Sequence, residues 1–404
     1  MLEKRDVYLF QLIKFKDKPL IKVLSGMRRC GKSSLLILFE SYLLANAVAP
    51  DHIIRMNFES LEYDDLTSYK QLYAYLQKKI AKDKGTYYLL LDEIQQVESW
   101  ERVVNSLQVD YPVDMYLTGS NAYLLSSELS TLLAGRYVEI PMQPLSFKEY
   151  LDFVGHEGSV SLSDRFTDYL TYGGLPTVIQ LMDQKETINA FLSGVVNTVI
   201  LKDVVQRNQV RDPALLESLL KYIAANIGNI VSTKKIADYL NSSGRKTTSD
   251  TIDNYLGMLE SAYIIHRANR YDLKGKLFLK TFEKYYIADL GIRNQLVGSR
   301  NTDYGQILEN IVFMELKHRQ YTVSIGKVGT LEVDFIAIRP GRKIYIQVSA
   351  TILDDTTRER ELRPLLAIED QYDKMILTMD YTFSKDFEGI KVVNILDFLL
   401  DDET

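Results

Sequence analysis

The sequence predicts an α/β protein: a parallel sheet with flanking helices comes first, and helical segments and a second α/β domain follow. Three observations support this class. Residues 19–44 read as an apolar strand, a glycine-containing loop and an apolar helix. Further apolar strands at 52–58, 87–91 and 113–118 are followed by polar residues, the pattern of buried parallel strands. Strands alternate with helices again between 304 and 404.

The first loop carries the most specific motif. GMRRCGKS at 26–33 follows the strand PLIKVLS and precedes the helix SLLILFESYLL, the order that G-x-x-x-x-G-K-[ST] requires. The glycines allow backbone N–H groups to face a phosphate, and the helix N-terminus adds its positive dipole end. Lys32 would reach the terminal phosphates, and the Ser33 hydroxyl would ligate Mg²⁺. A chance glycine-rich turn is the alternative. We assign ATP binding to Gly26, Met27, Arg28, Arg29, Cys30, Gly31, Lys32, Ser33 and Ser34.

Two acids end a later strand. The apolar run 87–91 leads into Asp92 and Glu93, sixty residues after Lys32. Asp92 would hold Mg²⁺ through water, and Glu93 would polarise the attacking water as general base. Without the loop, a solvated strand end would be the better interpretation.

Two further positions are candidates for contact with a γ-phosphate. Ser120 and Asn121 follow the strand 113–118, and we assign the sensing role to Asn121 or Ser120; a helix cap is the alternative. Arg136 follows Gly135 and precedes another strand. It would reach a γ-phosphate of its own chain or of a neighbour, or else form a structural salt bridge.

The middle of the chain divides into two predicted parts. Residues 151–210 form a helical lid and linker, which YGGLP at 172–176 interrupts as a hinge near the nucleotide or as an ordinary turn between helices. Residues 211–285 show three helices and two strands in winged-helix order, with a basic tip at 274–276. This part holds twelve Lys/Arg against eight Asp/Glu in a chain of net charge −6, a balance that is compatible with a polyanionic partner such as DNA. Acids on the third helix argue against base reading, and such modules also dock proteins.

The C-terminal part, 286–404, has a readable order. A helix is predicted at 306–318, strands at 322–327, 332–338 and 343–349, a helix at 357–368, and strands at 374–378 and 391–395. Glu309, Asp334 and the Gln347–Ser349 triplet resemble the placement of a PD-(D/E)xK nuclease centre. Gln347 stands where that centre has its third acid, and Ser349 where it has its lysine. Neither replacement suits the metal chemistry, so we expect an inactive nuclease that serves as a binding or assembly platform.

With these residues in view, nearly the whole chain resembles a prokaryotic family of AAA-type ATPases. Their P-loop domain precedes a C-terminal domain of unknown function with a restriction-endonuclease-like fold. The matching stretches include GMRRCGKSSLL, YYLLLDEIQ, LTGSNAYLL, LAGRYVEIPMQPLSFKEY, YGGLPTVI, KYYIADLGIRN, GQILENIVFMEL and EVDFIA. The resemblance implies an AAA-type core at 1–150 that binds ATP, with Asp92 and Glu93 in metal and base roles, a sensor near Asn121 and an arginine at Arg136. Some relatives carry Glu-x-Lys at 347–349, so the departure here counts against a nuclease.

Composition sets the remaining expectations. The single cysteine excludes an intrachain disulfide. No run approaches about 18–20 uninterrupted apolar residues, and the N-terminus is broken by charges, so we expect a cytoplasmic protein without a membrane partner. The first hypothesis is a Mg²⁺-dependent ATPase, a switch or motor coupled to a nucleic-acid or protein partner or to self-association. The alternatives are an ATP-regulated nuclease or DNA-binding protein, and a nucleotide-binding scaffold without turnover.

Overall fold

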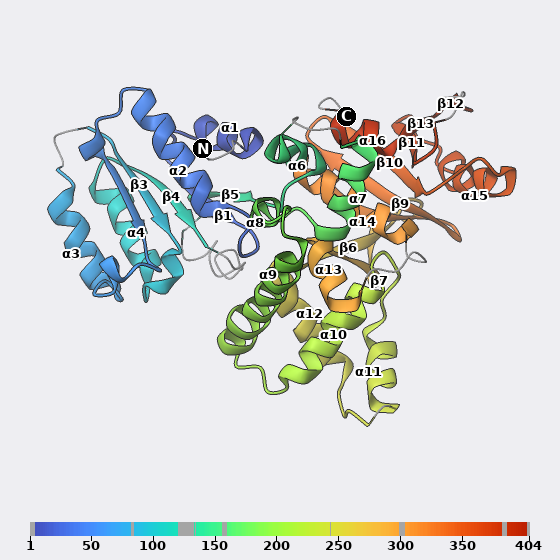
Figure 1. The fold of residues 1–404 in the computed structure, drawn as a ribbon, viewed down its shortest axis with the longest axis horizontal. Coiled ribbons are helices and arrows are strands. Elements are labelled where there is room, and N and C mark those ends of the chain that lie inside the picture. The colour runs from blue at the N-terminus through green and yellow to red at the C-terminus, as the bar shows by residue number, and fades with distance from the viewer. Residues whose placement is uncertain are drawn as a thin grey trace. The chain divides into compact units, whose positions relative to one another are not determined.

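The computed structural model describes residues 5–81, 85–119, 133, 135–155, 160–242, 244–298, 304–381 and 386–401, with the backbone alone at 201, 202, 280 and 281. The chain forms two compact units (Figure 1). Unit 1 comprises residues 1–142 with 261–263, and unit 2 comprises 143–260 with 264–404.

Unit 1 is built on a five-stranded parallel sheet of order β2-β3-β4-β1-β5. The strands are β1 (Ile21–Ser25), β2 (Ile53–Asn57), β3 (Tyr87–Asp92), β4 (Val113–Thr118) and β5 (Tyr137–Pro141). Four of them were predicted from the sequence to within two residues at each end, and β5 was predicted as a strand after Arg136. The helices are α1 (Asp6–Lys14), α2 (Lys32–Ala45), α3 (Tyr69–Lys79) and α4 (Trp100–Asp110), with short turns η1 (Pro50–His52), η2 (Leu61–Tyr63) and η3 (Ile94–Gln96).

Along each strand, successive side chains point to opposite faces of this sheet. Leu89 and Leu91 join the core that α3 and α4 cover. Tyr116 faces the other way and meets Phe39 of α2, with ring centroids 4.4 Å apart. Every residue of β1 and β3 is buried, as strands covered on both faces require. The carboxyl ends of β3, β4 and β1 therefore meet at one edge of a rigid sheet.

Unit 2 combines a helical part with an eight-stranded sheet. Its helices include α6 (Phe147–Val154), α7 (Leu162–Tyr172), α8 (Pro176–Gln180), α9 (Lys185–Thr198), η5 (Val199–Gln206), α10 (Pro213–Ala225), α11 (Thr233–Ser242), α12 (Ser249–Ser261), α13 (Leu290–Val297), α14 (Tyr304–His318), α15 (Asp355–Leu366) and α16 (Ile395–Leu400). Its strands are β6 (Ile265–Asp272), β7 (Leu277–Ile287), β8 (Thr322–Val328), β9 (Leu331–Arg339), β10 (Arg342–Ser349), β11 (Asp373–Thr378), β12 (Asp386–Phe387) and β13 (Ile390–Asn394).

The sheet of unit 2 crosses the predicted boundary between the basic module and the C-terminal domain. Its order is β12-β13-β11-β10-β9-β8-β6-β7. The hairpin β6–β7 has its turn at the basic tip, and β6 pairs in parallel with β8, with Arg270 opposite Ile325. Strand β7 itself spans the boundary drawn after 285. The helices α10, α11 and α12 and this hairpin follow the predicted order, and their assignment as a winged helix stays a prediction.

One helical stretch of the described chain, Lys185–Gln206 in α9 and η5, is long and apolar enough to cross a membrane by length and composition. Half of its most apolar window is buried inside the protein.

Candidate functional site

The glycine loop lies between β1 and α2, as the motif predicts. Gly26 and Gly31 have positive φ angles of 136° and 104°, and Arg29 has one of 68°. A Cβ on Gly26 would lie 2.1 Å from the carbonyl oxygen of Met142, so only glycine fits there. The loop conformation thus depends on the residues that define the motif.

Lys32 is nearly buried, at 4% exposure, and turns back onto this loop. Its Nζ donates to the carbonyl oxygens of Gly26 at 2.8 Å and Met27 at 2.9 Å. The ammonium is therefore held at the mouth of the loop, while Ser33 at the start of α2 is exposed.

The other loop residues have different surroundings. Arg28 pairs with Glu59 at 3.1 Å. Arg29 is exposed. Cys30 is buried, and its carbonyl oxygen accepts a hydrogen bond from the Arg5 guanidinium at 3.0 Å.

The predicted acids lie at the same edge of the sheet. Asp92 ends β3 and Glu93 follows it, with 4% and 7% exposure. Thr118, the last residue of β4, connects them: its hydroxyl donates to Asp92 Oδ1 at 2.5 Å and accepts from the backbone N–H of Glu93 at 2.9 Å. Glu93 adopts a left-handed backbone, φ 55°, and its carboxylate accepts from the Gln95 amide. Thr118 and Gln95 were missed in the sequence, where Thr118 read only as the end of a strand.

Three further positions were predicted to contact a γ-phosphate: Ser120, Asn121 and Arg136. Ser120 and Asn121 lie outside the described residues. Arg136 precedes β5, and its carbonyl oxygen accepts from the N–H of Ile21 at 2.9 Å, at the amino end of β1. The loop follows the carboxyl end of β1, about 13 Å away at the usual strand rise. The backbone of Arg136 therefore lies at the opposite end of β1 from the loop, and its role toward a γ-phosphate of its own chain or of a neighbour stays a prediction.

Thr118 provides a direct test of how the acids are oriented. Thr118→Val keeps the shape but removes both hydrogen bonds, so any ATP turnover by this site should fall about 10–100-fold, as for other groups that orient a catalytic ligand. The measurement is phosphate release under saturating ATP. Thr118→Ser, which keeps the hydroxyl, is the control and should retain most of the activity. Equal losses in both variants would contradict an orienting hydroxyl.

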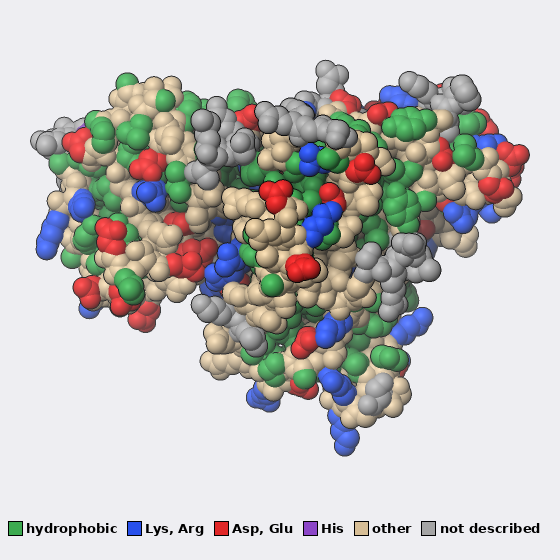
Figure 2. Space-filling model, in the orientation of Figure 1, with side chains coloured by type: hydrophobic (Ala, Val, Ile, Leu, Met, Phe, Trp, Pro, Cys, Tyr) green, Lys and Arg blue, Asp and Glu red, His purple; other side chains and the backbone are tan. Residues whose placement is uncertain are grey.

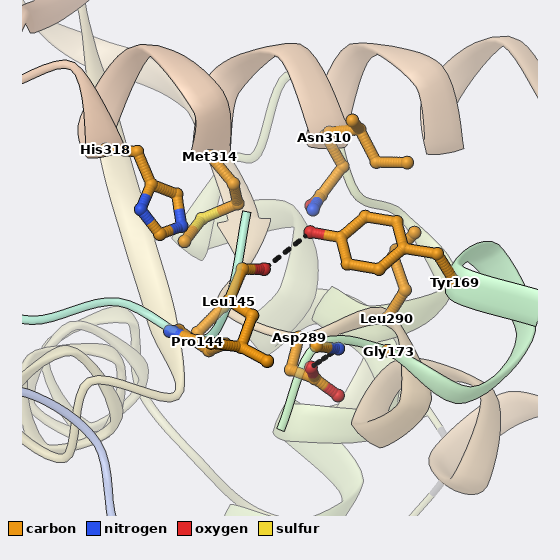
Figure 3. Close-up of a pocket in the computed structure, with 12 residues that line it drawn as sticks. Pro144, Leu145, Tyr169, Gly173, Asp289, Leu290, Asn310, Met314 and His318 are labelled. Atoms are coloured by element: carbon orange, nitrogen blue, oxygen red, sulfur yellow. Dashed lines mark hydrogen bonds between the residues drawn. The ribbon is translucent and has the colours of Figure 1, made fainter. Parts of the chain in front are cut away.

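The YGGLP segment forms a turn between α7 and α8 in unit 2, closed around a buried carboxylate. Asp289 accepts from the N–H of Gly174 at 2.7 Å and from that of Ile292 at 3.0 Å (Figure 3). A Cβ on Gly173 would lie 2.3 Å from Asp289 Oδ1, and Gly173 has φ 81°. The adjoining cavity, of about 20 Å³, has room for one water and not for a nucleotide. These contacts match the ordinary helix–helix turn among the two predicted alternatives.

Asp289 should make stability depend on pH. Burial raises the pKa of its carboxyl to about 6, against three backbone hydrogen bonds that lower it. The folded state then holds a proton more tightly than the unfolded state between about pH 4 and 6, so stability falls as pH rises through that window, by up to about 3 kcal/mol. Hydrogen exchange of peptides covering 162–180 and 286–297 measures the change. Asp289→Asn should flatten this part of the pH dependence; an unchanged slope would contradict the assignment.

The second predicted cluster lies in the sheet of unit 2, and the structure brings most of it together. Gln347 Oε1 accepts from the N–H of Asp334 at 2.7 Å, and Asp334 Oδ2 accepts from the N–H of Val348 at 2.9 Å. Ser349 turns away, since its hydroxyl donates to the carbonyl oxygen of Thr351. Glu309, on α14, lies at the same hollow as Asp334.

Two members of this cluster come from segments that the sequence did not indicate. Lys284 of β7 is 3.0 Å from Glu309, and Glu361 of α15 accepts from the Gln347 amide at 2.9 Å. Burial and the nearby Glu309 carboxylate raise the pKa of Asp334 well above its ordinary value. Burial lowers the pKa of Lys284, but the carboxylates of Glu309, Asp334 and Glu332 outweigh it and raise the pKa overall. Among the residues that the structure describes, no three His, Cys, Asp or Glu side chains are arranged to hold a metal ion.

Comparison with known proteins places these features in a family. Residues 18–151 match the family model described as "AAA domain", and residues 163–303 match "Domain of unknown function (DUF8612)". An uncharacterised protein of Haemophilus influenzae is 42% identical over 398 residues, 98% of each chain. One of Methanocaldococcus jannaschii is 31% identical over 363 residues, 85% of this chain and 77% of the relative.

Solved structures are similar only at a low level. The Aeropyrum pernix ORC1 protein in complex with DNA is 13% identical, with TM-score 0.34, covering 73% of this chain and 92% of that one. The Thermotoga maritima RuvB Holliday junction branch migration motor is 16% identical, with TM-score 0.34, covering 66% and 90%. Such similarities do not establish a function. The extent of the match to the Haemophilus and Methanocaldococcus proteins, with the AAA domain over the glycine loop and the acids of β3, shows that the chain belongs to their family of AAA-domain proteins.

Proposed function

We propose that the chain binds ATP with Mg²⁺ at 26–34 and hydrolyses it, as a switch or motor that responds to a partner. The observation that supports this best is the position of five groups at one sheet edge. The loop and Lys32 follow β1, and Asp92 ends β3 with Glu93 directly after it. Thr118 ends β4 and forms hydrogen bonds with both acids. A loop that only bound phosphate would not need a buried carboxylate beside the metal position.

The residues present fit a nucleotide with its metal. The loop provides a cradle that a Cβ on Gly26 would fill, and Lys32 is at its mouth. Ser33 and Asp92 would hold Mg²⁺, which neutralises charge on the phosphates; two protein ligands are enough where phosphates and waters supply the rest. Glu93 would accept the proton of the attacking water. Thr118 would fix the orientation of both acids.

We propose DNA as the partner, bound through the basic module at 211–285. A protein is the alternative partner. Lys and Arg side chains are visible over the part of unit 2 that holds α10 and α11 (Figure 2). Lys234 and Lys235 on α11 and Lys274 and Lys276 at the hairpin tip are exposed. Their charge suits phosphate contact without base reading.

The test is ATP turnover by the purified full-length chain with Mg²⁺, alone and with double- or single-stranded DNA. Lys32→Ala is the control, since it removes the phosphate-binding ammonium. Turnover that requires Lys32 supports the ATPase, and its absence in every condition would leave a nucleotide-binding scaffold. Stimulation by DNA that Lys234→Ala/Lys235→Ala reduces supports DNA as the partner. Basal turnover unaffected by DNA points to a protein.

A further inference from the structure

We propose that the Lys284 ammonium is the resident cation of the carboxylate cluster in unit 2, and that this centre works without a metal ion. The proposal concerns a site outside the nucleotide loop and is independent of ATP turnover. The loss of nuclease residues at 347 and 349 leaves the remaining acids without a stated role. Here their role is to bind the Lys284 ammonium.

The contacts of Lys284 come from several directions. Its Nζ is 3.0 Å from Glu309 of α14, 2.9 Å from Glu332 and 4.0 Å from Asp334, both of β9. The two short contacts have the length of charge-assisted N–H···O bonds. Oxygen ligands lie about 2.1 Å from Mg²⁺, so carboxylates at these separations are spaced for an ammonium group.

The backbone around Lys284 fixes it in this position. Lys284 and Tyr286 are two residues apart on β7 and share one face, and the Tyr286 hydroxyl donates to the same Glu309 oxygen at 2.6 Å. On the outer side, Val231 donates from its N–H to the carbonyl oxygen of Glu283 at 2.8 Å. The backbone at Gly228 lies close to the Glu309 carboxylate, since a Cβ there would lie 3.1 Å from it. Lys284 is consequently only 4% exposed, although it borders a hollow.

The hollow beside the cluster explains why a cation is needed. It has a volume of about 580 Å³, and four carboxylates border it: Glu309, Glu332, Asp334 and Glu361. Among the described residues that border the hollow, Lys284 is the one with a basic side chain. Glu361 also pairs with Arg360, and Glu332 also lies near Arg270. Without the charge of Lys284, however, Glu309 and Asp334 would face each other without a cation in buried surroundings, an arrangement that is costly unless a cation compensates it. A divalent ion would do so equally well, and the chain's own lysine takes that place.

Removal of the ammonium should therefore create a metal site. Lys284→Met keeps the length of the side chain but removes the cation that Glu309 and Asp334 share. In calorimetric titration of the full chain without nucleotide, it should bind Mn²⁺ roughly tenfold or more tightly than wild type, because affinity follows the charge of the ligand set. Lys274→Met, at the exposed hairpin tip, is the matched control and should bind Mn²⁺ no more tightly than wild type. Lys284→Met/Glu309→Gln should lose the gain, which assigns it to this cluster.

A second measurement uses the wild-type chain and remains informative if Lys284→Met fails to fold. Reductive methylation followed by mass spectrometry should leave Lys284 unmodified while Lys274 reacts, with or without millimolar Mn²⁺. The proposal is overturned if Mn²⁺ exposes Lys284 to methylation, if wild type binds Mn²⁺ at a site that Glu309→Gln abolishes, or if folded Lys284→Met gains no Mn²⁺ binding.

Discussion

Replacing Glu93 with glutamine is expected to lower ATP turnover about 100-fold or more while ATP affinity stays near that of wild type. Glutamine has the shape of glutamate but cannot accept a proton, and general-base catalysis contributes roughly 10²–10⁴-fold. The backbone of Glu93 is fixed by Thr118, at 2.9 Å, and is unaffected by the change. The loop that would bind the phosphates also remains intact, so binding and chemistry should separate.

The measurement pairs binding of a fluorescent ATP analogue with phosphate release in a single turnover. Lys32→Ala should lose binding as well as turnover, because its ammonium lies at the loop. Glu98→Gln is the matched control, an exposed acid five residues along the same segment, and should leave both unchanged. Wild-type turnover in Glu93→Gln would show that the base is another group, even if ATP hydrolysis itself is established.

The parts of this site that the sequence predicted are the local ones. Gly26, Gly31 and Lys32 lie within eight consecutive residues, and their strand and helix flank them directly. Asp92 and Glu93 were predicted because an apolar strand leads into them. Thr118 was not, since a threonine that ends a strand has no local mark of its role. Its function depends on β3 and β4 being neighbours, which only the folded sheet shows.

The carboxylate cluster of unit 2 shows more clearly which contacts cannot be predicted from sequence. From the sequence, Gln347 and Ser349 indicate only that the third acid and the lysine of a nuclease centre are missing. In the structure, Glu361 contacts Gln347 from a helix, and Lys284 reaches Glu309 from a strand that had been placed in a different module. No spacing rule connects residues so far apart along the chain. The pairing of β6 with β8 is equally non-local, and it makes the hairpin of the basic module part of the C-terminal sheet.

Breaking the buried ion pair between Lys22 and Asp114 is expected to destabilise unit 1 by about 3–5 kcal/mol, the usual cost of leaving one buried charge alone. The two side chains are 0% and 3% exposed. Burial lowers the pKa of Lys22 and raises that of Asp114, so both charges are held against a desolvation cost. Asp114 also accepts from the N–H of Asp17 at 2.9 Å and from the Tyr116 hydroxyl at 3.0 Å. The pair therefore fastens the turn before β1 to the sheet.

A double-mutant cycle in urea separates the pair from its surroundings. Trp100 is the only tryptophan of the chain and lies in the core of unit 1, so its fluorescence follows this unit. Lys22→Met and Asp114→Asn should each be strongly destabilising, and the double variant should lose less than their sum, by about 1–3 kcal/mol, because neither charge is then left alone. Arg55→Ala, which breaks the more exposed pair with Glu40, should cost no more than about 1 kcal/mol. Strict additivity in the double variant would mean that each side chain stabilises unit 1 through its other contacts and that the charges do not depend on one another.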